Sequence, residues 1–173
     1  MGKERKNPIN IFKNILIKKA GVLDFDGMFA LIPDFASQYN YDCVEKKHSE
    51  KSGATGTYIE SNWYLERKVT YYVKFIIEIE FLVRDMNTVV VEDEDGNKKK
   101  RNQGRVEILF NAKMQKNYLN NFKDDSKSKQ KSFSDFLRVI YEKYIGKKRL
   151  KDYEDKLEDE ARDILEDLKE KLE

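Results

Sequence analysis

Cysteine, histidine, proline and long apolar runs are all scarce in this chain of 173 residues. Cys43 and His48 are the only residues of their types. One cysteine excludes an internal disulfide, and one cysteine with one histidine cannot supply a Cys/His zinc site. Two prolines in the whole chain exclude a proline-rich linker or a collagen-like repeat. We therefore expect a folded domain that relies on its hydrophobic core and needs no cofactor.

Long uncharged stretches are missing as well. The longest stretch without Asp, Glu, Lys or Arg covers residues 52–59, eight residues, whereas a membrane span needs about 18 or more. Lys13 interrupts the apolar residues near the N-terminus, so this region does not form the apolar core of a signal peptide. These absences predict a cytoplasmic protein without a membrane span.

Charge is abundant but almost balanced. Charged residues make up 38% of the chain, and the net charge is only +2. Residues 147–173 hold eight basic and eleven acidic residues, a net charge of −3, which leaves +5 for residues 1–146. Neither part has the strongly basic balance of a dedicated nucleic-acid-binding domain.

Strict alternation of apolar and polar residues is the strongest structural signal. Every odd position in residues 69–83 is apolar, while even positions carry charged residues such as Lys74 and Glu78. This pattern indicates a strand of roughly 50 Å, which has to twist and bend. Similar alternation in residues 58–66 and 106–114, with turn signals at residues 52–56 and 95–96, predicts a strongly curved antiparallel meander of about five strands.

Helical spacing of apolar residues appears before and after these strands. It predicts helices at residues 26–39, 133–145 and 150–172, and Pro33 is expected to kink or shorten the first. The last helix carries a stripe with spacings of 3, 4, 4, 3, 4 and 4, formed by Leu150, Tyr153, Leu157, Ala161, Ile164, Leu168 and Leu172. We predict an α+β fold in which the sheet packs against an N-terminal helix and two C-terminal helices.

The N-terminal segment combines cations with apolar residues. We expect a short helix after Pro8 followed by an edge strand, which together dock onto the rest of the domain. Contact of residues 9–19 with an anionic membrane surface is the alternative. The expected division of the chain is a basic amphipathic arm at 1–22, an α+β core domain at 23–146 and a charged amphipathic helix at 147–173.

The candidate catalytic groups do not form a convincing site. Cys43 and His48 lie five positions apart on a predicted strand, so their side chains should face opposite sides and not form a nucleophilic pair. Glu78 and Glu80 share a strand face at about 7 Å, a spacing that acid–base pairs can use. Lys74 beside them favours an alternating charge ladder instead. We therefore do not expect an enzyme.

Two sets of residues are candidates for binding. The first is apolar and lies on faces that are otherwise charged, which indicates a protein partner or self-association: Ile76, Leu82, Leu150, Tyr153, Leu157, Ile164 and Leu168. The second is basic and could contact phosphates: Lys98, Lys99, Lys100, Arg101, Arg105, Lys127, Lys129 and Lys131.

Residues 63–69 (WYLERKV), 72–80 (YVKFIIEIE) and 104–108 (GRVEI), with the predicted helix at 133–145, resemble a group of small archaeal proteins whose function is not established. The resemblance implies an archaeal, cytosolic setting and adds no function. Pro33 and the basic N-terminal arm are atypical of that group. In outline the chain also resembles helix-grip, or START-like, domains, in which a bent sheet holds a long C-terminal helix.

Three functions follow as hypotheses. The first is a non-enzymatic interaction or structural module that packs into a larger assembly or a homo-oligomer. The second is binding of RNA or a ribosomal surface through the basic loops. The third, implied by the helix-grip outline, is a hydrophobic ligand held between sheet and helix.

Overall fold

The computed structural model describes residues 8–92, 96–119, 136, 140, 143 and 146–172. Its centre is an antiparallel sheet of five strands in the order β1-β5-β4-β3-β2. The strands are β1 (Ile9–Leu23), β2 (Asp42–Gly53), β3 (Gly56–Lys68), β4 (Val73–Glu92) and β5 (Lys98–Lys116). The helices found in the described residues are α1 (Phe25–Tyr39) and α3 (Lys147–Glu170). The α+β class and the antiparallel sheet are therefore confirmed.

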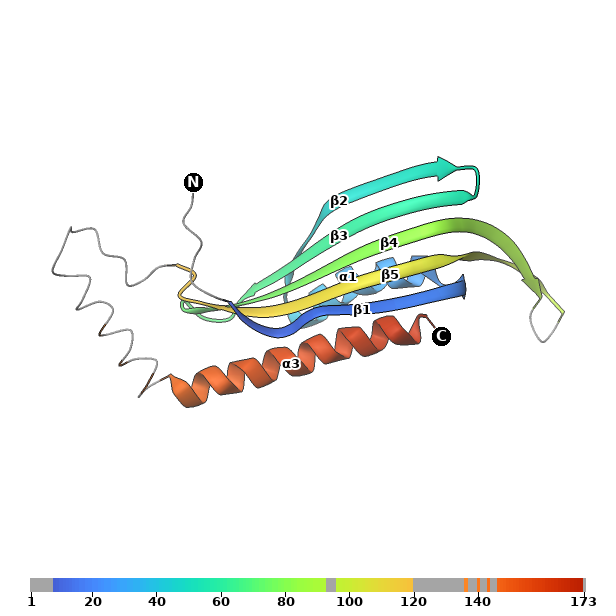
Figure 1. Cartoon of the computed structure of the whole chain (residues 1–173). Helices are drawn as coiled ribbons and strands as arrows, with labels where there is room; N and C mark the ends of the chain where they lie inside the picture. The colour runs from blue at the N-terminus through green and yellow to red at the C-terminus, as the bar shows by residue number, and fades with distance from the viewer. Residues whose placement is uncertain are drawn as a thin grey trace.

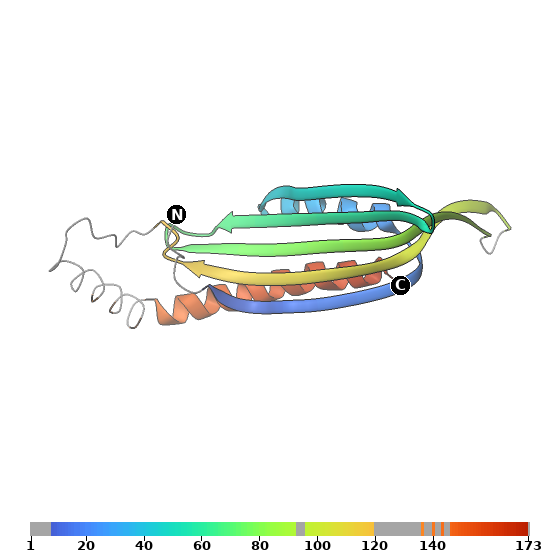
Figure 2. The same cartoon turned by 45° about the horizontal axis from the view of Figure 1, so that its top comes forward.

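Both helices lie on the same face of the sheet, which arches over them (Figure 1). Helix α1 contacts β2, whereas α3 contacts β1 and β5, and the two helices also touch each other. Figure 2 shows this arrangement, with α1 beneath the β2 side and α3 beneath the β1 side. No helix in the described part of the chain has the length and apolar character needed to span a membrane.

The three predicted helices do not match the two that are found in the described residues. Helix α1 confirms the expected helix at 26–39, and α3 confirms the one at 150–172. The helix expected at 133–145 lies outside the described residues, apart from Phe136, Ile140 and Lys143.

Helix α1 begins where Asp24 caps it, since the Asp24 carboxylate accepts a hydrogen bond from the Gly27 N–H at 3.1 Å. The early end expected at Pro33 does not occur, and the helix continues to Tyr39. Asn40 then ends it in the left-handed conformation, with φ of 57°. The buried residues of α1 are Phe25, Met28, Ile32, Phe35 and Ala36, which shows that burial of one face maintains the helix despite the proline.

Residues 9–23 form the edge strand β1, so the short helix expected after Pro8 is wrong. A bulge explains the error, because the register with β5 shifts between Phe12 and Ile15. Asn14 sits in the bulge with φ of 53°, and its N–H donates to Asn111 Oδ1 at 2.7 Å. The bulge interrupts the period of two that would have identified a strand. The apolar residues of this segment pack against the core, including Ile15 and Ile17.

The strand alternation places one side of β4 in the core, as predicted. Phe75, Ile77, Ile79, Phe81 and Val83 are each no more than 1% exposed. The strand starts four residues later than expected, because residues 69–72 form a turn. There the Thr70 hydroxyl oxygen accepts hydrogen bonds from the N–H groups of residues 72 and 73. Tyr71, expected to face the core, is 82% exposed.

The stripe of α3 is part of the core. Leu157, Ile164 and Leu168 are fully buried, Leu150 is 8% exposed, and Tyr153 packs edge-on against a core ring. The sequence predicts a partner-binding surface at these five residues. The chain's own sheet and α1 cover them instead, because an apolar stripe on a long charged helix is buried most readily against the nearest sheet.

A buried ion pair fixes α3 against the rest of the fold. The Arg67 guanidinium of β3 donates to both carboxylate oxygens of Glu160 at 2.7 and 2.8 Å, and to the Tyr39 carbonyl at 2.6 Å. The Tyr41 hydroxyl donates to Glu160 at 2.7 Å, and the Tyr39 hydroxyl donates to Asp163 at 2.6 Å. Burial raises the pKa of Tyr41, while the hydrogen bond to Asp163 raises that of Tyr39 to about 12. Both phenols therefore stay neutral donors at ordinary pH.

The Arg67–Glu160 pair can be tested with a double-mutant cycle. Arg67→Met or Glu160→Leu alone should lower the free energy of unfolding by about 3–5 kcal/mol, because each leaves a buried charge without its partner. The double variant should lose much less free energy of unfolding than the sum of the losses in the two single variants. Urea unfolding measures the stability of all three variants. Arg162→Met is the matched control, since its pair with Glu158 is also on α3 but exposed, and it should cost less than about 1 kcal/mol.

Candidate interaction surface

The face of the sheet opposite the helices, called the outer face below, receives alternate side chains from all five strands. None of the helices or strands in the described ranges covers it (Figures 1 and 2). Antiparallel sheets often leave one face in water, so exposure alone does not indicate a function. The arrangement of side chains on this face is more informative.

Charged side chains on the outer face pair between strands and not along them. The ion pairs are Lys18–Glu107 at 3.5 Å, Arg84–Glu107 at 3.9 Å, Lys113–Glu78 at 2.9 Å, Lys74–Glu66 at 3.0 Å and Lys47–Glu60 at 2.5 Å. Such half-exposed pairs contribute little stability, typically about 0–1 kcal/mol each. They join opposite charges on neighbouring strands, although Lys74 also lies opposite Lys68 and Arg84 opposite Arg105.

Local electrostatics keep this pattern intact near neutral pH. Partial burial opposes ionisation of Glu66, but the hydrogen bond and charge of Lys74 outweigh it and lower the pKa of Glu66. Burial, followed by the nearby Glu66 charge, raises the pKa of Tyr64 to about 12. The Tyr64 hydroxyl therefore remains a neutral donor to Glu66, at 3.1 Å, and Lys46 lies 3.5 Å from the centre of the Tyr64 ring.

Apolar side chains interrupt the charged pattern. Leu16 of β1 lies opposite Leu109 of β5 and is 52% exposed. Leu82 of β4 is paired with residue 107 and is therefore diagonal to Leu109. These three residues are called the outer leucines below. Val44, on the opposite edge of the same face, is 54% exposed.

The two β4 residues that we proposed as partner contacts, Ile76 and Leu82, both lie on the outer face. Ile76 is only 5% exposed, with the charged side chains of neighbouring strands around it, whereas Leu82 is half-buried. Sequence reasoning missed Leu16 and Leu109. Leu109 could have been found, since it is apolar but out of phase with the buried residues 108 and 110. Leu16 could not have been found, because the bulge in β1 breaks the alternation that would show on which face of the sheet Leu16 lies.

The outer face is large enough for a stable interface. Five strands about 4.8 Å apart give a width of about 24 Å, and a strand of 13 residues is about 43 Å long. The product is about 1,000 Å², whereas an ordinary protein interface buries about 800 Å² on each partner.

A line of irregularities crosses the sheet at one end of the outer face and bends it. Arg84 pairs with Arg105 but Asn87 pairs with Gln103, so residues 85 and 86 both lie opposite Gly104. This is a bulge, and Asp85 within it has φ of 54°. Gly104 permits the close approach, because a Cβ there would lie 3.0 Å from the Arg84 carbonyl oxygen. Beyond this bend, β4 and β5 continue without β3 (Figure 1).

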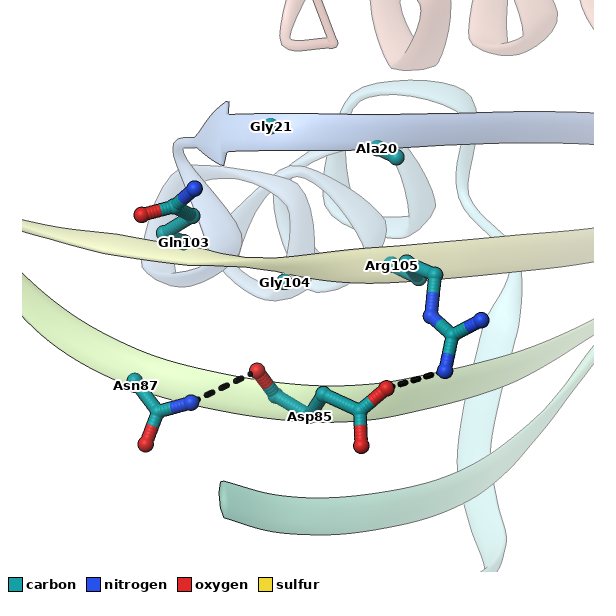
Figure 3. A pocket seen from close by; sticks show the side chains of 7 residues that line it. All are labelled: Ala20, Gly21, Asp85, Asn87, Gln103, Gly104 and Arg105. Atoms are coloured by element: carbon teal, nitrogen blue, oxygen red, sulfur yellow. Dashed lines mark hydrogen bonds and ion pairs between the residues drawn. The ribbon is translucent and has the colours of Figure 1, made fainter. Parts of the chain in front are cut away.

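An open hollow of about 360 Å³ lies at the bend, with the side chains of Asp85, Asn87, Gln103 and Arg105 around it (Figure 3). Arg105 forms an ion pair with Asp85, and Thr55 donates to the Asp85 carboxylate at 2.7 Å. Thr55 and then Arg105 lower the pKa of Asp85. Asn87 donates to the carbonyl oxygens of Thr55 and Asp85 at 2.8 and 3.0 Å. These bonds stabilise the bend itself and use most of the polar groups in the hollow.

The predicted basic patch is only partly assembled in the described residues. Lys98, Lys99, Lys100 and Arg101 are all exposed on β5 beyond the bend, whereas Arg105 lies at the bend and is paired with Asp85. Lys127, Lys129 and Lys131 lie outside the described residues. We call residues 88–92 of β4 and 98–101 of β5 the projecting ribbon.

Cys43 and His48 lie on the same face of β2, contrary to the alternation argument. A register shift between Glu45 and Lys47 moves His48 into phase with Cys43, since Cys43 pairs with Leu65 and His48 with Ser61. They are still about 13 Å apart along the strand. Burial raises the pKa of the Cys43 thiol.

The Glu45 carboxylate lies 2.8 Å from His48 Nδ1 and also accepts a hydrogen bond from the Ser61 hydroxyl at 2.6 Å. Ser61 is fully buried, so a substrate does not reach it. Across the described ranges, no group of three or more His, Cys, Asp or Glu residues is arranged to hold a metal ion.

The second hollow lies between the start of β4 and the start of α3, next to Val73 and Leu150, and measures about 80 Å³. Ligand pockets usually have about 300–1,000 Å³. This hollow is thus too small for the hydrophobic ligand that the helix-grip outline suggested. No known protein family matches the chain, and comparison with curated proteins finds no relative.

The bend can be tested by adding one methyl group. Gly56 of β3 has φ of 135°, and a Cβ there would lie 2.8 Å from the Asp85 backbone carbon. Gly56→Ala should therefore lower the free energy of unfolding by about 1–3 kcal/mol, measured by urea unfolding. Gly53→Ala, in the same hairpin, meets only an ordinary contact at 3.5 Å, and it should change stability by less than about 0.5 kcal/mol. Equal effects of the two substitutions would contradict this account.

Proposed function

We propose that this protein is a non-enzymatic interaction module that joins a larger assembly or a homo-oligomer through the outer face of its sheet. The observation that carries the proposal is the pair of exposed Leu16 and half-buried Leu109 among paired charges on the outer face. Apolar residues surrounded by polar and charged ones are the usual composition of a protein interface. The opposite face cannot serve this purpose, because α1 and α3 cover it.

Charge on the outer face supports specificity more than affinity. Its lysines and glutamates are already paired within the chain, so a partner has to present the complementary pattern to avoid leaving like charges opposed. The outer leucines would then supply most of the apolar contact. We infer a protein partner whose surface is charged and includes apolar side chains that meet the outer leucines.

The outer face can be tested with Leu16→Glu. We expect this substitution to weaken self-association or partner binding about tenfold or more, because it places an unpaired charge beside the other two outer leucines. Light scattering of the purified protein measures self-association, and affinity purification from the native source measures partner retention. Leu119→Glu is the control, since Leu119 is 50% exposed but lies past the end of β5.

Two outcomes would contradict the proposal. One is a strictly monomeric wild-type protein that retains no partner. The other is a Leu16→Glu variant that behaves like the wild type and like Leu119→Glu. Both substitutions replace exposed side chains, so the variants should unfold at the same urea concentration as the wild type.

RNA binding is a second candidate function, favoured by the projecting ribbon. Four consecutive cations, Lys98 to Arg101, are exposed on a strand that extends past the rest of the sheet. Such a ribbon can lay its cations along the phosphates of single-stranded RNA. Glu92, which is exposed at the end of the paired strand β4, reduces the positive electrostatic potential that attracts phosphates.

Salt titration tests this second candidate. If the ribbon contacts phosphates, Lys100→Gln with Arg101→Gln should reduce the slope of log affinity against log salt by about 0.7 per lost contact to single-stranded RNA. Lys151→Gln, which removes an exposed cation of α3, should leave the slope unchanged. Binding that does not depend on salt, or that all variants share, would reject the candidate.

A further inference from the structure

The two edges of the projecting ribbon differ in character: one is basic and the other is mostly apolar. The β5 edge carries Lys98, Lys99, Lys100 and Arg101, whereas the β4 edge carries residues 87–92, which read Asn-Thr-Val-Val-Val-Glu. No described strand pairs with this β4 edge, because the pairing of β3 ends with Thr57 opposite Met86. Val90 is 62% exposed and Val91 is 38% exposed.

The other strand edges of the described sheet are protected against further strand pairing. The outermost strands are β1 and β2, which carry three lysines each and a bulge each. Lysines and bulges are the usual devices that prevent a second strand from adding to an edge. The β4 edge of the ribbon differs from these two described edges. It has four consecutive β-branched residues, Thr88 to Val91, and neither a lysine nor an arginine.

We propose that this β4 edge pairs with the same edge of a second copy of the chain, antiparallel and centred on Val90. In this register, Val90 of one copy lies opposite Val90 of the other copy, and Val89 lies opposite Val91 of the other copy. Every valine then has a β-branched neighbour across the new strand pair, which is a favourable combination. The two ribbons together form a four-stranded sheet that extends between the copies.

Charge favours a second copy as the occupant and limits the assembly to two. In this register Glu92 lies opposite the uncharged Thr88 of the other copy, so no like charges are opposed. The basic β5 edges lie on the outside of the four-stranded sheet. Lys98 to Arg101 would oppose the same cations of any further copy, so strand addition ends with the dimer.

The contact is small, since each copy contributes about five residues. Its buried area is well below that of an ordinary stable interface, which is about 800 Å² per partner. The dimer should therefore be weak and depend on concentration. This surface is separate from the outer face, so the inference goes beyond the proposed function and does not rest on it.

Cysteine cross-linking tests the register directly. In a Cys43→Ser background, Val90→Cys should form a disulfide-linked dimer about tenfold faster than Val89→Cys, because facing residues are about 4.5–5.5 Å apart between Cα atoms and a disulfide spans this distance. In the same register, the two copies of residue 89 are offset by two positions and are too far apart to bridge. Val44→Cys, on the edge of β2, is the second control. Equal rates for the three variants would overturn the proposal.

A second measurement avoids cysteine chemistry. In a Leu16→Glu background, which removes self-association through the outer face, Val90→Lys should abolish the concentration-dependent dimer in sedimentation equilibrium. Hydrogen exchange at residues 88–92 of the Leu16→Glu protein should slow as its concentration rises. Leu119→Lys, at an exposed residue past the end of β5, should change neither result. A Leu16→Glu protein that remains monomeric at all soluble concentrations, or a dimer that survives the added Val90→Lys, would refute the pairing.

The inference and the proposed function fail separately in these experiments. Leu16→Glu disrupts the outer face but should leave the cross-linking rate of Val90→Cys unchanged. Val90→Lys should leave binding through the outer face unchanged. If one substitution abolished both activities, the two surfaces would not be independent, and the edge-pairing proposal would be rejected.

Discussion

The pairing of Arg67 with Glu160 is the interaction on which the arrangement of the whole fold depends. It joins the end of β3 to the middle of α3, and through the Tyr39 carbonyl it also includes the end of α1. A charge in this position is costly unless its partner is present, so the helix has one favourable rotation and one favourable position along its axis. The apolar stripe alone would allow α3 to slide by a turn. The ion pair gives the two layers a single register.

Fixing both helices to one side leaves the sheet with two different faces. The inner face is closed by side chains such as Phe81 and Leu157, which are no more than 1% exposed. The outer face keeps its charges ordered by cross-strand pairs of small individual energy. Ordered charges would lose less conformational entropy if a partner bound, even though the pairs add little to stability.

Much of the fold could be predicted from the sequence, because the inner side chains of β4 and the stripe of α3 repeat at the periods of a strand and a helix. The errors have specific causes. Bulges at Asn14 and near Lys46 break the period of two, and a turn at Thr70 looks like strand because its residues are apolar or β-branched. The candidate surface was less predictable. Periodicity shows that residues such as Leu157 form a stripe, but it does not show whether the chain itself or a partner covers them.

The bend at Gly104 separates a part of the protein whose sequence is constrained by packing from a part whose sequence is not. On the helix side of the bend, a single added methyl group meets neighbouring atoms, as at Gly56. On the other side, the ribbon contributes no residue to the hydrophobic core. It can therefore gain or lose residues in pairs, one on each strand, without altering the register behind the bend. The length of the ribbon can change in evolution while the body of the fold stays the same.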